Sequence, residues 1–212
     1  MKINAVITKK PRIKLQSVKL DFVNKTLFLI AGIIFLSIIS GALIYKLKSE
    51  VIKASVFEIF VAFSTDVTGK SFFEAVSGFF AVDLSVLIIL SILGTSAFGR
   101  VPILVVTAFR TLGIGALGAY LLDSFGVDGF KYYSIVILPG KAFMLFALLL
   151  SVQNCFQTSR KLKLYTLEKS NEKVDYNIYI ARNSVALIIF ALSALIDSLL
   201  LKYVSQYFLP NI

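Results

Sequence analysis

The 212-residue sequence contains no histidine and a single cysteine, Cys155. Without histidine the chain lacks the side chain that most often serves as a general base and as a metal ligand. One cysteine cannot form an internal disulfide, and no histidine is present to activate its thiol. No serine, cysteine or lysine stands in a recognisable nucleophile–base motif. The sequence therefore predicts that the protein is not an enzyme and has no metal site or cofactor.

Charged residues are also scarce. They make up 16% of the chain, whereas a soluble domain would carry about a quarter. Hydrophobic residues reach 58% and the mean hydropathy is +0.85. This composition predicts one integral membrane domain covering residues 1–212, because the length suits a single compact unit.

Five apolar stretches approach the length of about 20 residues that a helix needs to cross a bilayer. Each is bounded by a charge, a glycine or proline, or a polar run. We therefore expect an all-α, polytopic bundle of about five transmembrane helices, at Leu27–Tyr45, Gly78–Phe98, Pro102–Leu122, Tyr132–Val152 and Val185–Tyr203.

The net charge of +10 comes mainly from two segments that flank these stretches. Residues 1–26 hold seven Lys or Arg, and the predicted loop 154–183 holds six. Basic clusters beside apolar spans mark the cytoplasmic side and attract anionic lipid head groups. They predict an N-in/C-out protein of the cytoplasmic membrane that contacts membrane lipids and does not bind nucleic acid.

The first outer segment, residues 46–77, contains a short amphipathic pattern. Apolar residues recur at helical spacing over residues 51–63, a length too short to span the membrane comfortably. We interpret it as an outer helix that lies on the membrane surface or docks a partner through Phe57, Phe60 and Phe63. A helix packed across the bundle is an equally good interpretation.

Four ionisable residues interrupt four different apolar stretches: Asp83, Arg110, Lys141 and Asp197. A charge near the bilayer centre costs about 3 kcal/mol or more, so such residues face one another or a wet cavity. They predict an internal charge network, with Asp83 near the outer end of its span. Salt bridges that fix helix neighbours are the favoured interpretation, and a polar pathway for a solute is the alternative.

Two glycine-containing motifs fall inside predicted spans. Gly113, Gly115 and Gly118 match the dinucleotide pattern G-x-G-x-x-G, but no strand precedes them, so we read them as a helix-packing face. Pro139 and Gly140 interrupt the fourth span directly before Lys141 and predict a helix kink.

The pattern resembles the stage II sporulation protein M family, small multi-pass membrane proteins of spore-forming bacteria. Length, basic N-terminus, five spans and an outer segment all agree, and the most specific part runs over residues 92–152. It comprises Gly94–Gly99 at the end of span two, Pro102, Phe109–Gly115 in span three and Ile137–Pro139 in span four. The resemblance implies a non-enzymatic scaffold for engulfment. Its partners would be the D and P proteins of the same stage, which degrade peptidoglycan outside the membrane.

Two function classes therefore stay open. In the first, the bundle recruits or localises peptidoglycan hydrolases outside the membrane, alone or as a homo-oligomer. In the second, it is a transporter or permease subunit that uses the four charges and couples to an ATPase through loop 154–183.

Overall fold

All elements that the structure describes are helices. The computed structural model describes residues 25–47, 71–167 and 175–208, so residues 1–24 and the predicted helix 51–63 lie outside it. The described helices are α1 (Lys25–Leu47), α3 (Phe72–Gly94), α4 (Arg100–Tyr132), η1 (Tyr133–Ile137), α5 (Leu138–Leu167), α6 (Tyr176–Leu199), η2 (Leu200–Val204) and α7 (Ser205–Phe208). The all-α prediction is confirmed.

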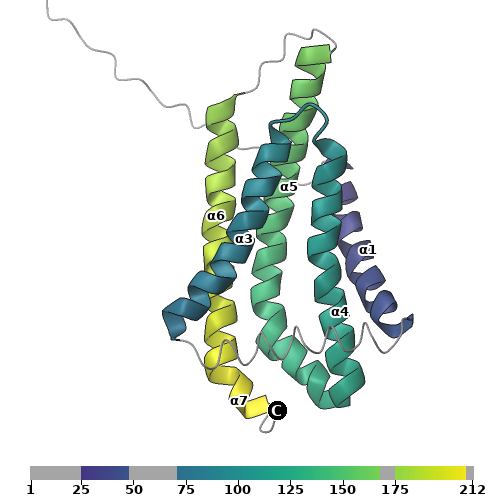
Figure 1. Cartoon of the computed structure of the whole chain (residues 1–212), viewed down its shortest axis with the longest axis vertical. Coiled ribbons are helices and arrows are strands. Elements are labelled where there is room, and N and C mark those ends of the chain that lie inside the picture. The colour runs from purple at the N-terminus through teal and green to yellow at the C-terminus, as the bar shows by residue number, and fades with distance from the viewer. Residues whose placement is uncertain (1–24, 48–70, 168–174, 209–212) are drawn as a thin grey trace, which may run out of the picture.

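Four helical stretches among the described residues are long and apolar enough to cross a membrane. They cover Thr26–Leu47, Phe72–Gly94, Arg100–Thr166 and Tyr176–Phe208. The third contains 67 residues and holds two predicted spans, 102–122 and 132–152. At about 1.5 Å per residue a straight helix of that length would far exceed a bilayer. The chain instead reverses inside it, so α4 and α5 run side by side (Figure 1).

The reversal is made by Gly126, whose φ of +56° lies in the left-handed region that glycine adopts without strain. The residues on either side remain helical, although residues 123–131 lie between two predicted spans. The two arms approach closely, since a Cβ on Gly129 would lie 1.9 Å from the Leu121 carbonyl oxygen. A tight helical hairpin therefore replaces the expected loop.

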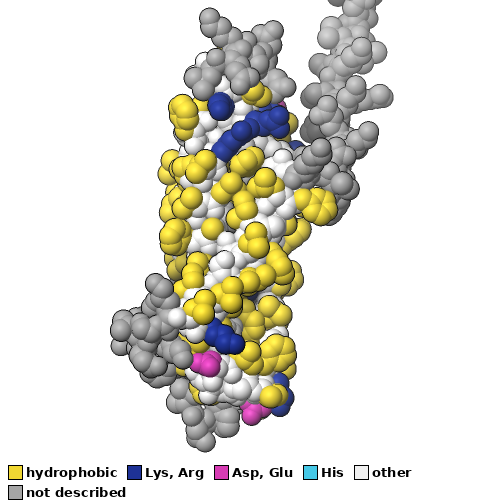
Figure 2. Space-filling model, turned by 90° about the vertical axis from the view of Figure 1, so that its right-hand side faces the viewer, with side chains coloured by type: hydrophobic (Ala, Val, Ile, Leu, Met, Phe, Trp, Pro, Cys, Tyr) yellow, Lys and Arg dark blue, Asp and Glu magenta, His cyan; other side chains and the backbone are white. Residues whose placement is uncertain are grey.

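The surface follows the membrane pattern. Figure 2 shows a broad hydrophobic belt with Lys and Arg side chains at its upper edge, and basic and acidic side chains near its lower edge. At the upper end, α3 ends, α4 begins, α5 ends and α6 begins (Figure 1). The described basic residues of that end are Arg100, Arg160, Lys161, Lys163 and Arg182.

Several predicted helix boundaries differ from the observed ones. Helix α3 begins at Phe72 rather than near residue 78, because Ser71 and Glu74 form a capping box. The predicted loop 154–183 is mostly helical: α5 continues to Leu167, and α6 begins at Tyr176 after the Asp175 side chain caps its first turn. The described helices are thus longer than the apolar stretches that predicted them.

Helix α1 packs mainly against α4, and glycines bring the two backbones together. A Cβ on Gly115 would lie 1.9 Å from the Ile38 carbonyl oxygen, and one on Gly41 would lie 2.0 Å from that of Leu112. A Cβ on Gly118 would instead lie 3.1 Å from the nearest atom of the Tyr133 ring. Gly113 departs from the predicted packing face, because a Cβ there would meet no atom within 4 Å. It lies two residues from Gly115, which places it on another side of the helix.

Gly115 and Gly113 give a matched test of the α1–α4 contact. We expect Gly115→Ala to lower the free energy of unfolding, because the methyl group would force the backbones apart at Ile38. Gly113→Ala should be neutral or stabilising by up to about 1 kcal/mol, since alanine favours a helix. Unfolding of the purified protein in mixed micelles measures both. Equal effects of the two substitutions would contradict the packing described.

Candidate functional site

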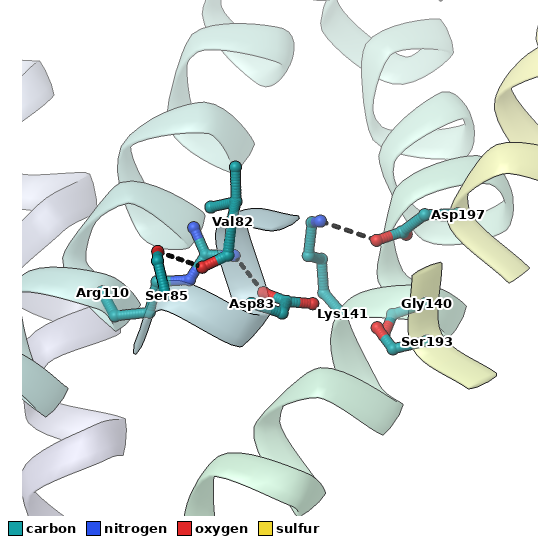
Figure 3. A network of polar contacts seen from close by, with 8 residues as sticks. All are labelled: Val82, Asp83, Ser85, Arg110, Gly140, Lys141, Ser193 and Asp197. Carbon is teal, nitrogen blue, oxygen red and sulfur yellow. Dashed lines mark hydrogen bonds and ion pairs between the residues drawn. The ribbon is translucent and has the colours of Figure 1, made fainter. Parts of the chain in front are cut away.

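The four intramembrane charges form two ion pairs (Figure 3). The Arg110 guanidinium on α4 donates to Oδ1 of Asp83 on α3, at 2.5 Å. The Lys141 ammonium on α5 donates to Oδ2 of Asp197 on α6, at 2.7 Å. All four predicted residues are therefore brought together in pairs, each linking two helices.

The two pairs belong to one neutral cluster. The Lys141 ammonium lies 5.5 Å from the centre of the Phe79 ring, one helical turn from Asp83 on α3. Its charge is close enough to attract Asp83 as well as its own partner. We call the residues Asp83, Arg110, Lys141 and Asp197 the charge cluster. Two positive and two negative charges cancel within it.

Burial differs between the acids and the bases. The carboxylate side chains are almost fully buried, at 4% exposure for Asp83 and 3% for Asp197. The Lys141 side chain is 16% exposed and the Arg110 side chain 27%. Arg110 also keeps a buried Nε without a hydrogen-bond partner among the described residues. The acids are thus sealed inside the bundle, and the longer basic side chains reach them from its edge.

The charge cluster lies near the boundary of two apolar cores. On α3, Asp83 lies between Phe79 of one core and Leu87 of the other. Lys141 likewise lies between Ile137 and Met144, which belong to different cores. Because α3 begins at Phe72, Asp83 stands at the middle of that helix and not near its outer end as predicted.

Gly140 brings α5 and α6 into direct contact at the second ion pair. A Cβ on Gly140 would lie 1.9 Å from Oδ1 of Asp197, so any larger residue would displace the carboxylate. Its carbonyl oxygen also accepts a hydrogen bond from the Ser193 hydroxyl, at 2.9 Å. The sequence assigned Gly140 to a kink, whereas the structure gives it a close approach.

The predicted irregularity near Pro139 is present but begins earlier. A π-helical segment, η1, occupies Tyr133–Ile137 and ends directly before the α5 turn that contains Pro139. Proline lacks an N–H and crowds the carbonyl four residues before it, and a wider turn accommodates both effects. A second π-helix, η2, contacts η1 and follows Asp197 on α6. The Lys141–Asp197 pair is therefore flanked by irregular turns on both helices.

The sequence analysis missed a second polar network near the basic end. The Asn154 amide donates to the Asn183 Oδ1 at 2.9 Å and to the Tyr179 carbonyl at 3.1 Å. The Asn183 amide donates to the Ser91 hydroxyl at 3.1 Å, and the Tyr179 hydroxyl donates to the Ser91 carbonyl at 2.8 Å. Asn154 and Asn183 had been placed at the two ends of the predicted loop. Their position at the limits of apolar stretches was the available signal.

Other predicted features fall away from the charge cluster or outside the described residues. Phe57, Phe60 and Phe63 are outside those residues. Cys155 is buried, with its sulfur 3.4 Å from the Tyr179 hydroxyl oxygen. Within the ranges that the structure describes, no group of three or more His, Cys, Asp or Glu could hold a metal ion. The polar interactions of the described residues are ion pairs and hydrogen bonds, many of them between helices.

Comparison with known families identifies the chain. The family model for Stage II sporulation protein M matches residues 26–200. The chain belongs to the stage II sporulation protein M family. Searches of curated proteins and of solved structures found no match. As a family member it is a multi-pass membrane protein, and the match includes the whole charge cluster and the polar network at Asn154 and Asn183.

A double-mutant cycle tests the pairing in this family member. Asp197→Asn or Lys141→Met alone should lower the free energy of unfolding by about 3 to 5 kcal/mol, because each leaves a buried charge without its partner. The double variant should lose less than the sum of the two. Unfolding by sodium dodecyl sulfate in mixed micelles provides the measurement.

The mixed double variant Asp83→Asn/Lys141→Met is the control for that cycle. It removes one residue of each pair and leaves Arg110 and Asp197 without those partners, so its loss should lie close to the sum of the two single losses. If both double variants behaved alike, the assigned pairs would be wrong.

Proposed function

We propose that the protein is a non-enzymatic membrane scaffold that recruits or localises peptidoglycan-degrading partners outside the membrane during sporulation engulfment. Family membership implies a role in sporulation. Peptidoglycan lies outside the cytoplasmic membrane, so its partners would meet this protein at the outer ends of the helices. The proposal assigns the partners to that end and gives the charge cluster a supporting role.

The main support for the proposal is that the acids of the charge cluster are buried and paired. Both carboxylates are sealed from solvent and each is bonded to a base from a neighbouring helix. A transport site has to expose its charges to solute in at least one state, and its charges have to exchange partners. A scaffold needs the opposite, which is a fixed arrangement of helices. Two fully paired, mutually neutralising ion pairs suit the scaffold.

One observation supports the transport alternative. The π-helices η1 and η2 flank the Lys141–Asp197 pair, and π-turns occur frequently at functional sites. Such turns would permit a rearrangement of α5 against α6. The proposal instead treats them as the local accommodation of Pro139 and of the close contact at Gly140.

The proposed orientation is N-in/C-out in the cytoplasmic membrane, with five crossings. The hairpin at Gly126 supports counting α4 and α5 as separate crossings, because the two helices run in opposite directions and each contains one of the predicted spans (Figure 1). The basic residues at the upper end support a cytoplasmic position for that end. The turn at Gly126 and the C-terminal helix α7 would then lie outside.

Cysteine accessibility tests this orientation. In a Cys155→Ser background, single substitutions Val127→Cys and Tyr207→Cys should react with a membrane-impermeant maleimide in intact cells, since both side chains are exposed near the outer end. Tyr165→Cys, exposed at the basic end of α5, should react only after permeabilisation. Labelling of Tyr165→Cys in intact cells, or of Val127→Cys and Tyr207→Cys on opposite sides, would contradict the orientation or the number of crossings.

A second experiment separates scaffold from transporter. The double variant Asp83→Asn/Arg110→Gln replaces one ion pair by a neutral amide pair of similar shape. We expect it to fold, to copurify with peptidoglycan hydrolases from sporulating cells and to support engulfment at near wild-type frequency. A folded variant that keeps its partners but loses engulfment would favour transport.

Partner docking is tested at the outer segment. Replacing Phe57, Phe60 and Phe63 together by serine should reduce hydrolase copurification at least tenfold, because aromatic anchors dominate most interfaces. Phe73→Ser is the matched control, since Phe73 is an exposed phenylalanine at the outer end of α3. Equal loss in both variants, or no loss in the triple variant, would rule out docking through this segment.

A further inference from the structure

An apolar groove opens on the membrane-facing surface between α1 and α5. It has a volume of about 330 Å³ and is lined chiefly by Ile34, Phe35 and Ile38 from α1 and by Leu145, Phe146 and Leu149 from α5. Among the described residues, no charged side chain lines it. Because the groove lies within the hydrophobic belt, its natural contents are hydrocarbon.

The α5 face that lines the groove continues directly to the basic end. Phe156 follows Leu149 after seven residues and so lies on the same side of the helix, about 10 Å nearer the end. Arg160 follows Phe156 by one further turn and is exposed. The groove and these two residues therefore form one continuous track along α5.

Arg100 joins this track from α4. Its guanidinium lies over the Phe156 ring, 5.2 Å from the ring centre. Its Nε is buried and has no hydrogen-bond partner among the described residues. Neither Arg100 nor Arg160 forms an ion pair with a described acid. Two cationic side chains without a described counter-ion thus stand where the apolar track meets the basic end.

The length of the track matches one leaflet of a bilayer. From Leu145 to Phe156 the rise is about 16 Å, and the hydrocarbon half of a typical bilayer is about 15 Å thick. A chain lying in the groove would therefore bring its head group to the level of Arg100. The charge at that level selects a head group that is negative.

We propose that an anionic phospholipid occupies this track, with an acyl chain in the α1–α5 groove and its phosphate bound by Arg100 and Arg160. Arginine binds phosphate through paired N–H donors, which suits it to a fixed site better than a lysine. Figure 2 shows basic side chains at the upper edge of the hydrophobic belt. The phosphates of that leaflet would lie at about this level. The site would make the packing of α1 depend on lipid composition and goes beyond the scaffold proposal.

The absence of tryptophan from the chain makes a direct test available. The variant Phe146→Trp places a fluorophore in the groove, and Phe109→Trp places one on the exposed, lipid-facing side of α4 as a matched control. The purified full-length variants are reconstituted in phosphatidylcholine vesicles. Each receives the same low mole fraction of phosphatidylglycerol or phosphatidylcholine with brominated acyl chains, and quenching is compared.

We expect brominated phosphatidylglycerol to associate with Phe146→Trp roughly 25-fold more strongly than brominated phosphatidylcholine, because each of the two arginines near the surface contributes about 1 kcal/mol, or about fivefold. Phe109→Trp should show no preference. Adding Arg100→Gln or Arg160→Gln to Phe146→Trp should reduce the preference about fivefold, whereas Arg182→Gln, on α6 at the same end, should leave it unchanged.

Three results would overturn the proposal. The first is equal quenching of Phe146→Trp by the two lipids. The second is a preference for phosphatidylglycerol that survives substitution of both Arg100 and Arg160, or one that Arg182→Gln abolishes equally well. The third is protection of Phe146→Trp from every brominated lipid, which would mean that a second copy of the chain or a partner helix covers the groove. The comparison of the two lipids in Phe146→Trp, which keeps both arginines, stays decisive even if an arginine variant fails to fold.

Discussion

The cost of a bare charge inside a membrane governs the arrangement of this bundle. Asp83 and Asp197 are sealed from solvent, so each must be bonded to a base wherever the protein is folded. That requirement makes α3 a neighbour of α4 and α5 a neighbour of α6. Lys141 on α5 also lies over the Phe79 ring of α3 and so links the two pairs of helices. Removing one member would therefore disturb four helices.

Apolar contacts could not supply this specificity, because lipid tails are as apolar as the side chains they would replace. The bundle instead uses a different polar or small-residue contact at each depth. Asn154, Asn183 and Ser91 form hydrogen bonds to one another near the basic end, and the charge cluster lies near the boundary of the two apolar cores. Gly41 and Gly115 hold α1 on α4 through backbone proximity. Each contact fixes one neighbour, and together they define the bundle.

The sequence predicted the helices and the charged residues well because both follow from composition. Apolar length predicts a span, and a charge within a span predicts a buried partner. The pairing of the four charges could not be predicted, since two acids and two bases at similar depth can pair in more than one way. The choice depends on which helices are adjacent. The helix ends were misjudged because hydropathy detects the lipid-facing length only. The capping box at Ser71 and Glu74, visible in the sequence, would have placed the start of α3 correctly.

The contacts of the glycines also could not be predicted from the sequence. Gly113 and Gly115 look alike in the sequence, yet only Gly115 touches a neighbouring backbone. The spacing identified the helix but not the side that faces α1. Likewise Gly140 stands beside Pro139, which suggested a kink, while its main contact is with Asp197 on another helix. Such assignments depend on the partner helix, which a single sequence does not specify.

The order of the charges along the chain has a consequence for biogenesis. Asp83 and Arg110 are 27 residues apart, so their pair can form as soon as α4 leaves the ribosome and enters the membrane. Lys141 precedes Asp197 by 56 residues and therefore enters with α5 before its own counter-ion has been synthesised. During that interval the Asp83 carboxylate is the nearest available acid. If the helices insert in chain order, a half-assembled stage with one surplus positive charge precedes the arrival of α6, which neutralises it.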